Sequence, residues 1–212
     1  MRHDKECDLN RKRTSVTRDA TVEEIKAFFE THCDRVVTFV GYSDKGYETP
    51  HAMLDQASRV LREFDPANTI VNAGGTASGI GAVYGLAKQY GFVTTGIVSM
   101  QAKEAQAALS PDVDYVFFVP DASWGGYLPQ TEQLSPTSTA MVEVSHIIIG
   151  MGGGAVARDE LLAAKKLGKA VRFFPAEMNH AIVRAEANET GEPAPNDFLG
   201  AAHEVLERFD RA

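Results

Sequence analysis

Two glycine-rich turns carry the residues whose types and spacing best suit contact with a phosphate. The first is NAGGTASGIG, residues 72–81, and the second is GMGGGAVARDEL, residues 150–161. Each follows an apolar run typical of a strand and precedes a helical pattern, where backbone N–H groups can approach an anion. The alternative is that the glycines only let a helix pack closely on a strand. The candidate phosphate-binding residues of these turns are Gly74, Gly75, Thr76, Gly152, Gly153, Gly154 and Ala155.

Further candidates follow other predicted strands. Gly41, Ser43 and Lys45 come after the first strong strand and could add phosphate contacts, unless they are solvated turn residues. A long loop over 121–136 contains Trp124 and Tyr127. These rings could stack on a base or fill the edge of the core.

Four polar residues could contact a ribose or a base. Asp159 and Glu160 begin the helix after the second glycine turn, where they either complement the helix dipole or bind ribose hydroxyls and orient a water. Glu160 is the candidate catalytic residue. Asn179 and His180 follow the last strand and are candidate base or ribose contacts, although a lone histidine is often structural.

Composition narrows the class of protein. The chain has 21 basic and 29 acidic residues, a formal charge of -8, which argues against a broad DNA- or RNA-binding surface. Cys7 and Cys33 form no CxxC motif and no cluster with histidines, so we expect no disulfide framework, no metal site and a cytoplasmic location. The basic N-terminus is followed by no apolar stretch, which predicts neither a signal peptide nor a membrane span. No lysine follows the glycines in Walker spacing, which disfavours ATP-driven phosphoryl transfer.

Alternating strands and helices must position these residues. We expect near-continuous apolar strands at 36–40, 69–73, 92–99, 114–120, 146–150 and 170–174, with helical patterns between them. This order predicts an α/β protein with a three-layer, Rossmann-like, doubly wound parallel sheet in a single domain. In such sheets the loops after the strands meet at one edge, so the candidate residues are expected to lie together.

Composition shifts suggest the boundaries of the domain. Residues 1–20 are polar and basic and are expected to form a mobile arm, and residues 21–186 form the Rossmann-like nucleotide-binding domain. The segment 187–197 contains proline and glycine and is expected to be a linker. A final amphipathic helix over 198–212 is expected to pack on the domain or on a second subunit.

The run from Val36 through Ile182 resembles the Lonely Guy and lysine-decarboxylase-like family, within the Smf and Lonely Guy superfamily of Rossmannoid nucleotide-binding proteins. TFVGYSDKGYET resembles its opening strand and phosphate-side loop, and IVNAGGTASGIGAVYGLAKQYGFVTTGIVS its first glycine motif. GGAVARDEL resembles the PGGxGTxxE signature. The resemblance implies a nucleotide or phosphoribosyl ligand, a small-molecule partner and a homo-oligomer, with a dimer favoured.

The second motif departs from the family pattern around its glycine pair. Gly153, Gly154 and Glu160 match the signature, whereas Gly152 stands in place of proline, Val156 in place of the third glycine and Ala157 in place of threonine. The enzymes of the family carry an arginine on the preceding helix, and the corresponding SPTSTAMVEVSH contains no arginine or lysine.

These departures shift the expected function from catalysis toward binding. The leading hypothesis is a non-catalytic or divergent member that binds a nucleotide or phosphoribose at the two turns. One alternative is a nucleoside 5'-monophosphate phosphoribohydrolase, an N-glycosyl hydrolase that uses Glu160. Another is a carrier of a molybdenum cofactor or a sensor of a nucleotide signal. A purely structural protein, with its glycine turns filled by side chains, is a further alternative.

Overall fold

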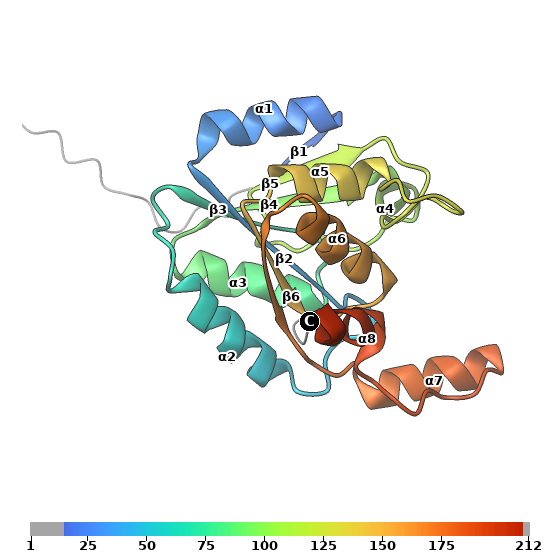
Figure 1. Cartoon of the computed structure of the whole chain (residues 1–212). Coiled ribbons are helices and arrows are strands. Elements are labelled where there is room, and N and C mark those ends of the chain that lie inside the picture. The colour runs from blue at the N-terminus through green and yellow to red at the C-terminus, as the bar shows by residue number, and fades with distance from the viewer. Residues whose placement is uncertain (1–14, 210–212) are drawn as a thin grey trace, which may run out of the picture.

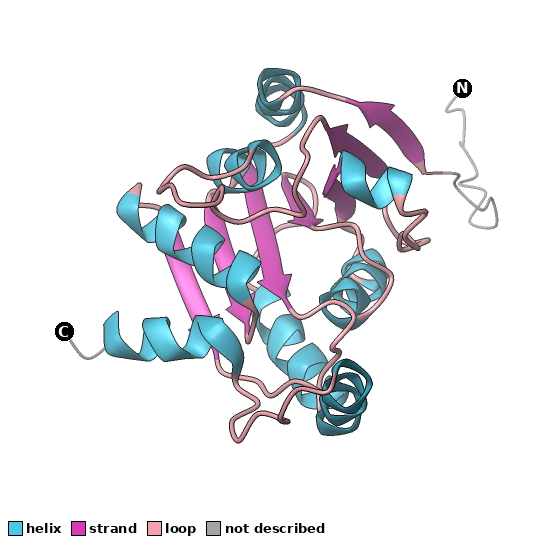
Figure 2. Cartoon of the chain, turned by 90° about the vertical axis from the view of Figure 1, so that its right-hand side faces the viewer, coloured by secondary structure: helices cyan, strands magenta, loops and turns pink. Residues whose placement is uncertain are grey.

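The computed structural model describes residues 15–209, which form one parallel sheet with helices on both faces (Figures 1 and 2). All seven strands run parallel, in the order β1-β5-β4-β3-β2-β6-β7. The predicted α/β Rossmann-like class is therefore confirmed. The strands are β1 (Val16–Asp19), β2 (Arg35–Gly41), β3 (Thr69–Ala73), β4 (Val93–Ser99), β5 (Tyr115–Val119), β6 (Ile147–Met151) and β7 (Ala170–Phe174).

Helices cover the two faces of the sheet in two separate hydrophobic clusters. α2 and α3 pack on one face, and α1, α5, α6 and α8 pack on the other. α7 projects at the lower right of Figure 1. The helices are α1 (Val22–His32), α2 (Pro50–Leu61), a short 3-10 turn η1 (Gly79–Gly81), α3 (Ala82–Gln89), α4 (Met100–Glu104), α5 (Pro136–Val144), α6 (Ala155–Lys166), α7 (His180–Thr190) and α8 (Gly200–Phe209).

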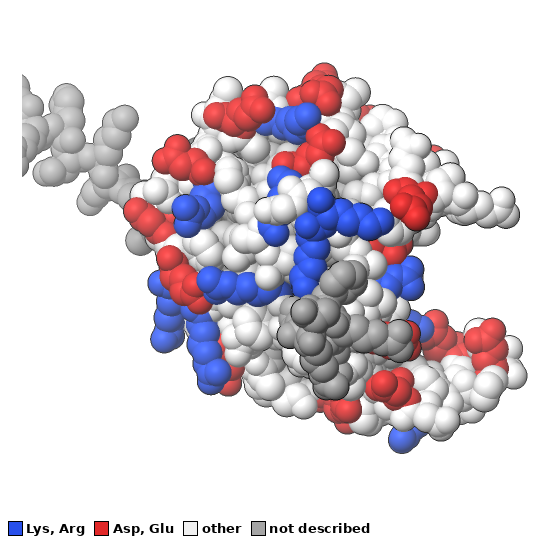
Figure 3. All heavy atoms as spheres, viewed as in Figure 1, with Lys and Arg blue, Asp and Glu red and all other residues white. Residues whose placement is uncertain are grey.

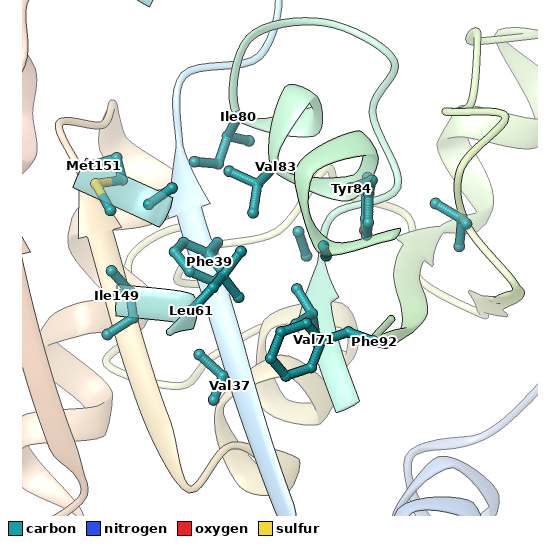
Figure 4. Close-up of a cluster of buried hydrophobic side chains, with 14 of the residues drawn as sticks. Val37, Phe39, Leu61, Val71, Ile80, Val83, Tyr84, Phe92, Ile149 and Met151 are labelled. Atoms are coloured by element: carbon teal, nitrogen blue, oxygen red, sulfur yellow. The ribbon is translucent and has the colours of Figure 1, made fainter. Parts of the chain in front are cut away.

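The central strands are apolar on both sides because both sides are covered. Phe39 of β2 and Ile149 of β6 are fully buried on the α2 and α3 face, in a cluster that also contains Leu61 and Tyr84 (Figure 4). Val36, Ile148 and Leu161 belong to the cluster on the opposite face. A sheet buried in this way fixes the register of its strands, so the loops at its carboxyl edge are held in place.

The last part of the predicted N-terminal arm is a strand. Residues 16–19 pair with β5 as the edge strand β1, in place of the mobile segment expected over 1–20. All four residues of β1 are exposed, and the segment VTRD has no apolar pattern that would indicate a strand. Its pairing is set by the free edge of β5 and not by burial. The earlier part of the arm, residues 1–14, lies outside the described residues.

The C-terminal boundaries also differ from those expected. α7 continues to Thr190, so the first residues of the predicted linker 187–197 are helical, and Gly191 ends the helix in the left-handed conformation. The final helix begins at Gly200 and packs on α6 of the same chain, with Ala202 and Leu206 fully buried. Residues 210–212 of the predicted helix lie outside the described residues.

Surface charge is mixed on the face shown in Figure 3. Lys and Arg side chains gather across the middle of this face, with Asp and Glu around them. Several of the described basic residues are paired: Arg172 with Glu63 at 2.7 Å, and Lys26 with Glu143 at 2.9 Å. Such pairs reduce the positive field that this region would otherwise present to an acidic partner.

Candidate functional site

The candidate site lies where the order of the strands reverses. The chain builds β3, β4 and β5 on one side of β2 and then returns to place β6 on its other side. At such a point, helices leave on opposite faces and open a crevice beyond the carboxyl ends of the strands. Gly41 at the end of β2 pairs with Met151 of β6. The loop after β2 and both glycine turns therefore meet at this edge.

Hydrogen bonds fasten the first glycine turn, which follows β3. The N–H of Gly75 donates to the Tyr84 hydroxyl at 3.0 Å. Gly75 has φ +74°, and a Cβ added there would lie 2.5 Å from the Val98 side chain. The fold itself therefore requires glycine at this position. The Thr76 hydroxyl accepts from the N–H of Ser78 at 3.2 Å, so Thr76 stabilises its own loop.

Ser43 and Lys45 lie in the loop after β2, beside the first glycine turn. The two loops are joined by the Ser78 hydroxyl, which donates to Asp44 at 3.2 Å. Ser43 is exposed at this edge. The ammonium of Lys45 instead pairs with Glu186 of α7. Ser43 is thus exposed at the carboxyl edge of the sheet, whereas the Lys45 ammonium is turned toward α7.

The second glycine turn connects β6 to α6 and is buried on one side. Gly152 has φ +57°, and a Cβ added there would lie 2.6 Å from the ring of Tyr42. The carbonyl of Gly153 accepts from the N–H of Ala202 at 3.0 Å, so α8 covers this part of the turn. Gly154 is the N-cap of α6 and makes no side-chain capping hydrogen bond. The first N–H groups of α6 have no carbonyl of their own helix to bind, by position.

Gly74 and Gly154 differ from every other glycine of the chain. All 18 glycines lie in the part of the chain that the structure describes. Only these two combine an ordinary φ with empty space, since an added Cβ would meet no atom within 4 Å. The fold would therefore accept a side chain at both positions. They follow β3 and β6, the two strands beside β2, whose ends are separated by about 10 Å at normal strand spacing.

Glu160 is buried between α5 and α6 and is only 4% exposed. The Ser138 hydroxyl donates to its Oε1 at 2.6 Å and accepts from the N–H of Gly126 at 2.7 Å. Burial raises the pKa of Glu160 to about 7; the hydrogen bond from Ser138 opposes this shift and the charge of Asp159 adds to it. α5 thus presents a neutral hydroxyl to Glu160, and its sequence contains no arginine.

Asp159 and the long loop over 121–135 are joined directly. Oδ2 of Asp159 accepts from the N–H of Tyr127 at 3.0 Å, and Oδ1 pairs with the Arg158 guanidinium at 2.8 Å. The Tyr127 ring lies 5.7 Å from the Lys166 ammonium, toward the carboxyl end of α6. Trp124 is 57% exposed, beside a glycine that packs on the first turn of α6. The Trp124 ring is therefore accessible to a ligand, whereas Tyr127 lies along the flank of α6.

Asn179 and His180 begin α7 and already have local partners. The Asn179 side chain caps α7 by accepting from the N–H of Ile182 at 3.0 Å. Nε2 of His180 contacts Glu177 at 3.0 Å, and its ring centroid lies 4.0 Å from that of Phe198. Both residues therefore hold the start of α7 in place.

Two tyrosines that the sequence interpretation did not single out shape this edge. The Tyr42 hydroxyl donates to the carbonyl of Leu199 at 2.5 Å, and its ring lies against Gly152. The Tyr47 hydroxyl donates to the carbonyl of Met151 at 2.8 Å. Both residues are 3% exposed. The two tyrosines stand on either side of a polar turn, directly after a buried strand. This position in the sequence is the signal that could have identified them.

The candidate residues therefore divide into two groups. Glu160, Asp159, Tyr127, Lys45, Asn179 and His180 are engaged in contacts outside the crevice. Gly41, Ser43, Gly74, Thr76, Gly154 and Ala155 lie at or shortly after the carboxyl ends of β2, β3 and β6. Within residues 15–209, no group of three or more His, Cys, Asp and Glu residues is placed to hold a metal ion. No helix in this range is long and apolar enough to cross a membrane.

Comparison with known proteins finds similar folds at low sequence identity. No protein-family model and no curated protein matches the sequence. The structural-genomics target TM1055 is 17% identical, with a TM-score of 0.48 over 84% of this chain and 99% of that chain. A molybdenum cofactor carrier protein from Chlamydomonas reinhardtii is 16% identical, with a TM-score of 0.47 over 84% and 99%. The molybdenum cofactor binding protein of Rippkaea orientalis is 16% identical, with a TM-score of 0.49 over 84% and 96%. Similarity of this degree assigns neither a family nor a ligand to the chain.

Proposed function

We propose that the protein binds a small phosphate-bearing ligand, a nucleotide or phosphoribose, between the first glycine turn and the start of α6. The observation that supports this proposal is the pair of glycines, Gly74 and Gly154, at which the fold itself does not need glycine. Both follow strands next to β2, and both leave the backbone open to an approaching group. A glycine in such a position allows a phosphate to reach backbone N–H groups that a Cβ would screen.

The start of α6 supplies the electrostatic part of the proposed site. Gly154 gives the helix no side-chain cap, which leaves its first N–H groups and the positive end of its dipole available to an anion. Ser43, exposed on the loop after β2, adds a hydroxyl at the same edge. Trp124 offers an accessible ring on which the base of a nucleotide would stack. On this proposal the chain is a divergent member of the Lonely Guy and lysine-decarboxylase-like family.

Binding without turnover suits the surroundings of Glu160 better than hydrolysis does. Cleavage of an N-glycosidic bond needs a carboxylate close to the sugar, where it can stabilise positive charge in the transition state. Glu160 is instead buried beneath the long loop and bound to Ser138. We therefore assign Glu160 to positioning the loop and the start of α6 beneath the ligand.

Phosphoribohydrolase activity is the second candidate, and the pKa of Glu160 favours it. A carboxyl group whose pKa is about 7 can exchange a proton near neutral pH. This function requires the long loop to move so that Glu160 meets the ribose. Incubation with a panel of nucleoside monophosphates tests it. Release of free base that is lost in Glu160→Gln would establish hydrolysis, and no release from any of them would exclude that panel as substrates.

Ligand binding itself is tested by calorimetry and thermal shift with AMP, ribose 5-phosphate, ADP-ribose, cyclic dinucleotides and molybdopterin. A ligand that binds the folded protein raises its unfolding temperature. We expect Gly74→Ala and Gly154→Ala to fold normally but to bind at least about tenfold more weakly, because each blocks charge-assisted hydrogen bonds to the phosphate. Gly85→Ala, in the middle of α3, is the matched control and should leave binding unchanged. The proposal would be contradicted if both variants bound with unaltered affinity, or if no compound in the panel bound the protein.

The oligomeric state remains a prediction that light scattering would test. A homodimer is the expected state, with a mass twice that of the chain. α8 is not available to form the whole interface, because its buried face already packs on α6 of the same chain.

A further inference from the structure

A hollow lies beside the ends of β6 and β7. It has a volume of about 400 Å³ and is bounded by α2, the ends of β6 and β7, and the segment before α8. Ala176 and Leu199 both line it. Their backbone carbonyls accept hydrogen bonds from the Tyr42 hydroxyl at 3.2 and 2.5 Å. Tyr42 thus binds two residues of the lining and also lies against Gly152 of the second glycine turn. A cavity of this size is in the range that holds small organic ligands.

The hollow is apolar over much of its lining and acidic at one side. Met53, Met151 and Phe174 supply apolar surface, and Glu48 and Glu177 are its charged residues. No lysine or arginine lines it. The N-terminus of α2 contributes a partial positive charge of about half a unit, which two carboxylates exceed. The net field in the hollow therefore favours a cation.

The two carboxylates are held in place by their neighbours. The N–H of Glu48 donates to the carbonyl of Glu177 at 3.1 Å, so the two residues are tied through the backbone. Oε2 of Glu48 accepts from the N–H of His180 at 2.9 Å, and Oε2 of Glu177 contacts the His180 ring at 3.0 Å. Each carboxylate uses part of its capacity in these contacts. Both side chains are close to half exposed and so can meet a ligand.

We propose that this hollow binds a small organic cation, an amine or amidine carried on an aromatic or alkyl body. The apolar body would lie against Met53, Met151 and Phe174, where its burial is favourable. The cationic group would lie between Glu48 and Glu177, where it meets two acceptors at once. Charge complementarity selects this occupant over an anion, and the apolar lining selects it over a bare metal ion. The site uses none of the residues assigned to the phosphate site proposed above.

Isothermal titration calorimetry with three probes of matched shape tests this proposal. 2-Phenylethylamine carries a positive charge, 2-phenylethanol is neutral and phenylacetate is negative. We expect the amine to bind at least about tenfold more tightly than the alcohol and the carboxylate to bind most weakly. No detectable binding of the amine, or equal binding of the three probes, would overturn the proposal.

Variants show whether the amine occupies this hollow. Glu48→Gln and Glu177→Gln should each weaken amine binding several-fold to about tenfold, and both keep an oxygen for the contacts with His180. Glu63→Gln, an exposed carboxylate paired with Arg172, is the matched control and should have no effect. Met53→Trp should block the hollow. Amine binding that survives Met53→Trp or ignores both glutamate variants places the amine elsewhere and overturns the proposal. Gly154→Ala should leave amine binding unchanged, which separates this result from the phosphate site.

Discussion

The Ser138 hydroxyl donates a hydrogen bond to Glu160 and accepts one from the backbone of the long loop. One side chain near the start of α5 thereby connects α6 to the loop over 121–135. Because Glu160 is buried, its charge has few compensating partners other than this hydroxyl. The protonation of Glu160 therefore bears on how firmly the loop is held.

Glu160→Gln should change how stability depends on pH. The pKa of Glu160 is about 7 in the folded protein, above its ordinary value of 4.5. Its contribution to stability is therefore fully present below about pH 4.5 and is lost as pH rises to 7, by roughly 3 kcal/mol in all. The substituted amide does not ionise and keeps an oxygen for Ser138. The stability of the variant should therefore rise relative to that of the wild type as the pH increases over this range. Urea denaturation at several pH values measures the difference, and a difference that does not vary with pH would contradict the prediction.

Gly75→Ala and Gly74→Ala should differ sharply in stability although the positions are adjacent. Gly75 has a left-handed backbone and no room beside Val98, so we expect a loss of about 2 kcal/mol or more. Gly74 faces open space with an ordinary φ, so alanine there should change stability by less than about 0.5 kcal/mol. Chemical denaturation of both variants checks this. Equal losses would mean that Gly74 also serves the fold.

Tyr42→Phe should loosen the start of α8 while leaving the sheet intact. The hydroxyl donates to the carbonyl of Leu199, one residue before the helix, and its loss should cost about 1 kcal/mol. Faster hydrogen exchange at residues 200–202 would report the local effect. Tyr90→Phe, which removes a hydroxyl bound to Ser58 on another face, is the control. Exchange that is unchanged in Tyr42→Phe, or equally faster in the control, would be against this role.

Trp124→Ala should separate ligand contact from structure. The side chain is 57% exposed, so its removal should alter stability by less than about 0.5 kcal/mol. If a base stacks on the ring, affinity for a nucleotide should fall about tenfold or more, whereas affinity for ribose 5-phosphate should not change. Trp124 is the only tryptophan of the chain, so its fluorescence in the wild type should also respond to the nucleotide. Equal affinities of the variant and wild type for a nucleotide would place the base elsewhere.

The sequence predicted the sheet well because its strands are buried on both faces. Residues such as Phe39 and Ile149 form continuous apolar runs, and such runs between helical patterns are typical of parallel sheets. β1 could not be predicted in this way, since its four exposed residues owe their conformation to the neighbouring edge of β5. The start of the linker expected over 187–197 was also misplaced, because α7 continues into this polar and largely exposed segment.

The two glycine turns could be recognised from the sequence. Which of their glycines the fold requires could not. The two turns stand out by spacing, yet only three-dimensional contacts separate Gly75, which the fold requires, from Gly74, which it does not. The burial of Glu160 depends on Ser138 and the long loop, which are distant in sequence. Tyr42 was missed because its partner, the carbonyl of Leu199, lies far along the chain.

The hydrogen bond from Ala202 to Gly153 has a consequence for the order in which the molecule is made. During synthesis, β6 and α6 are made before α8. The carbonyl of Gly153 therefore has no hydrogen bond from Ala202 until α8 has been made. The turn between β6 and α6 reaches its final form only after α8 has emerged and packed against it. Because α8 follows all seven strands in the chain, the second glycine turn gains this contact only after the whole sheet has been synthesised.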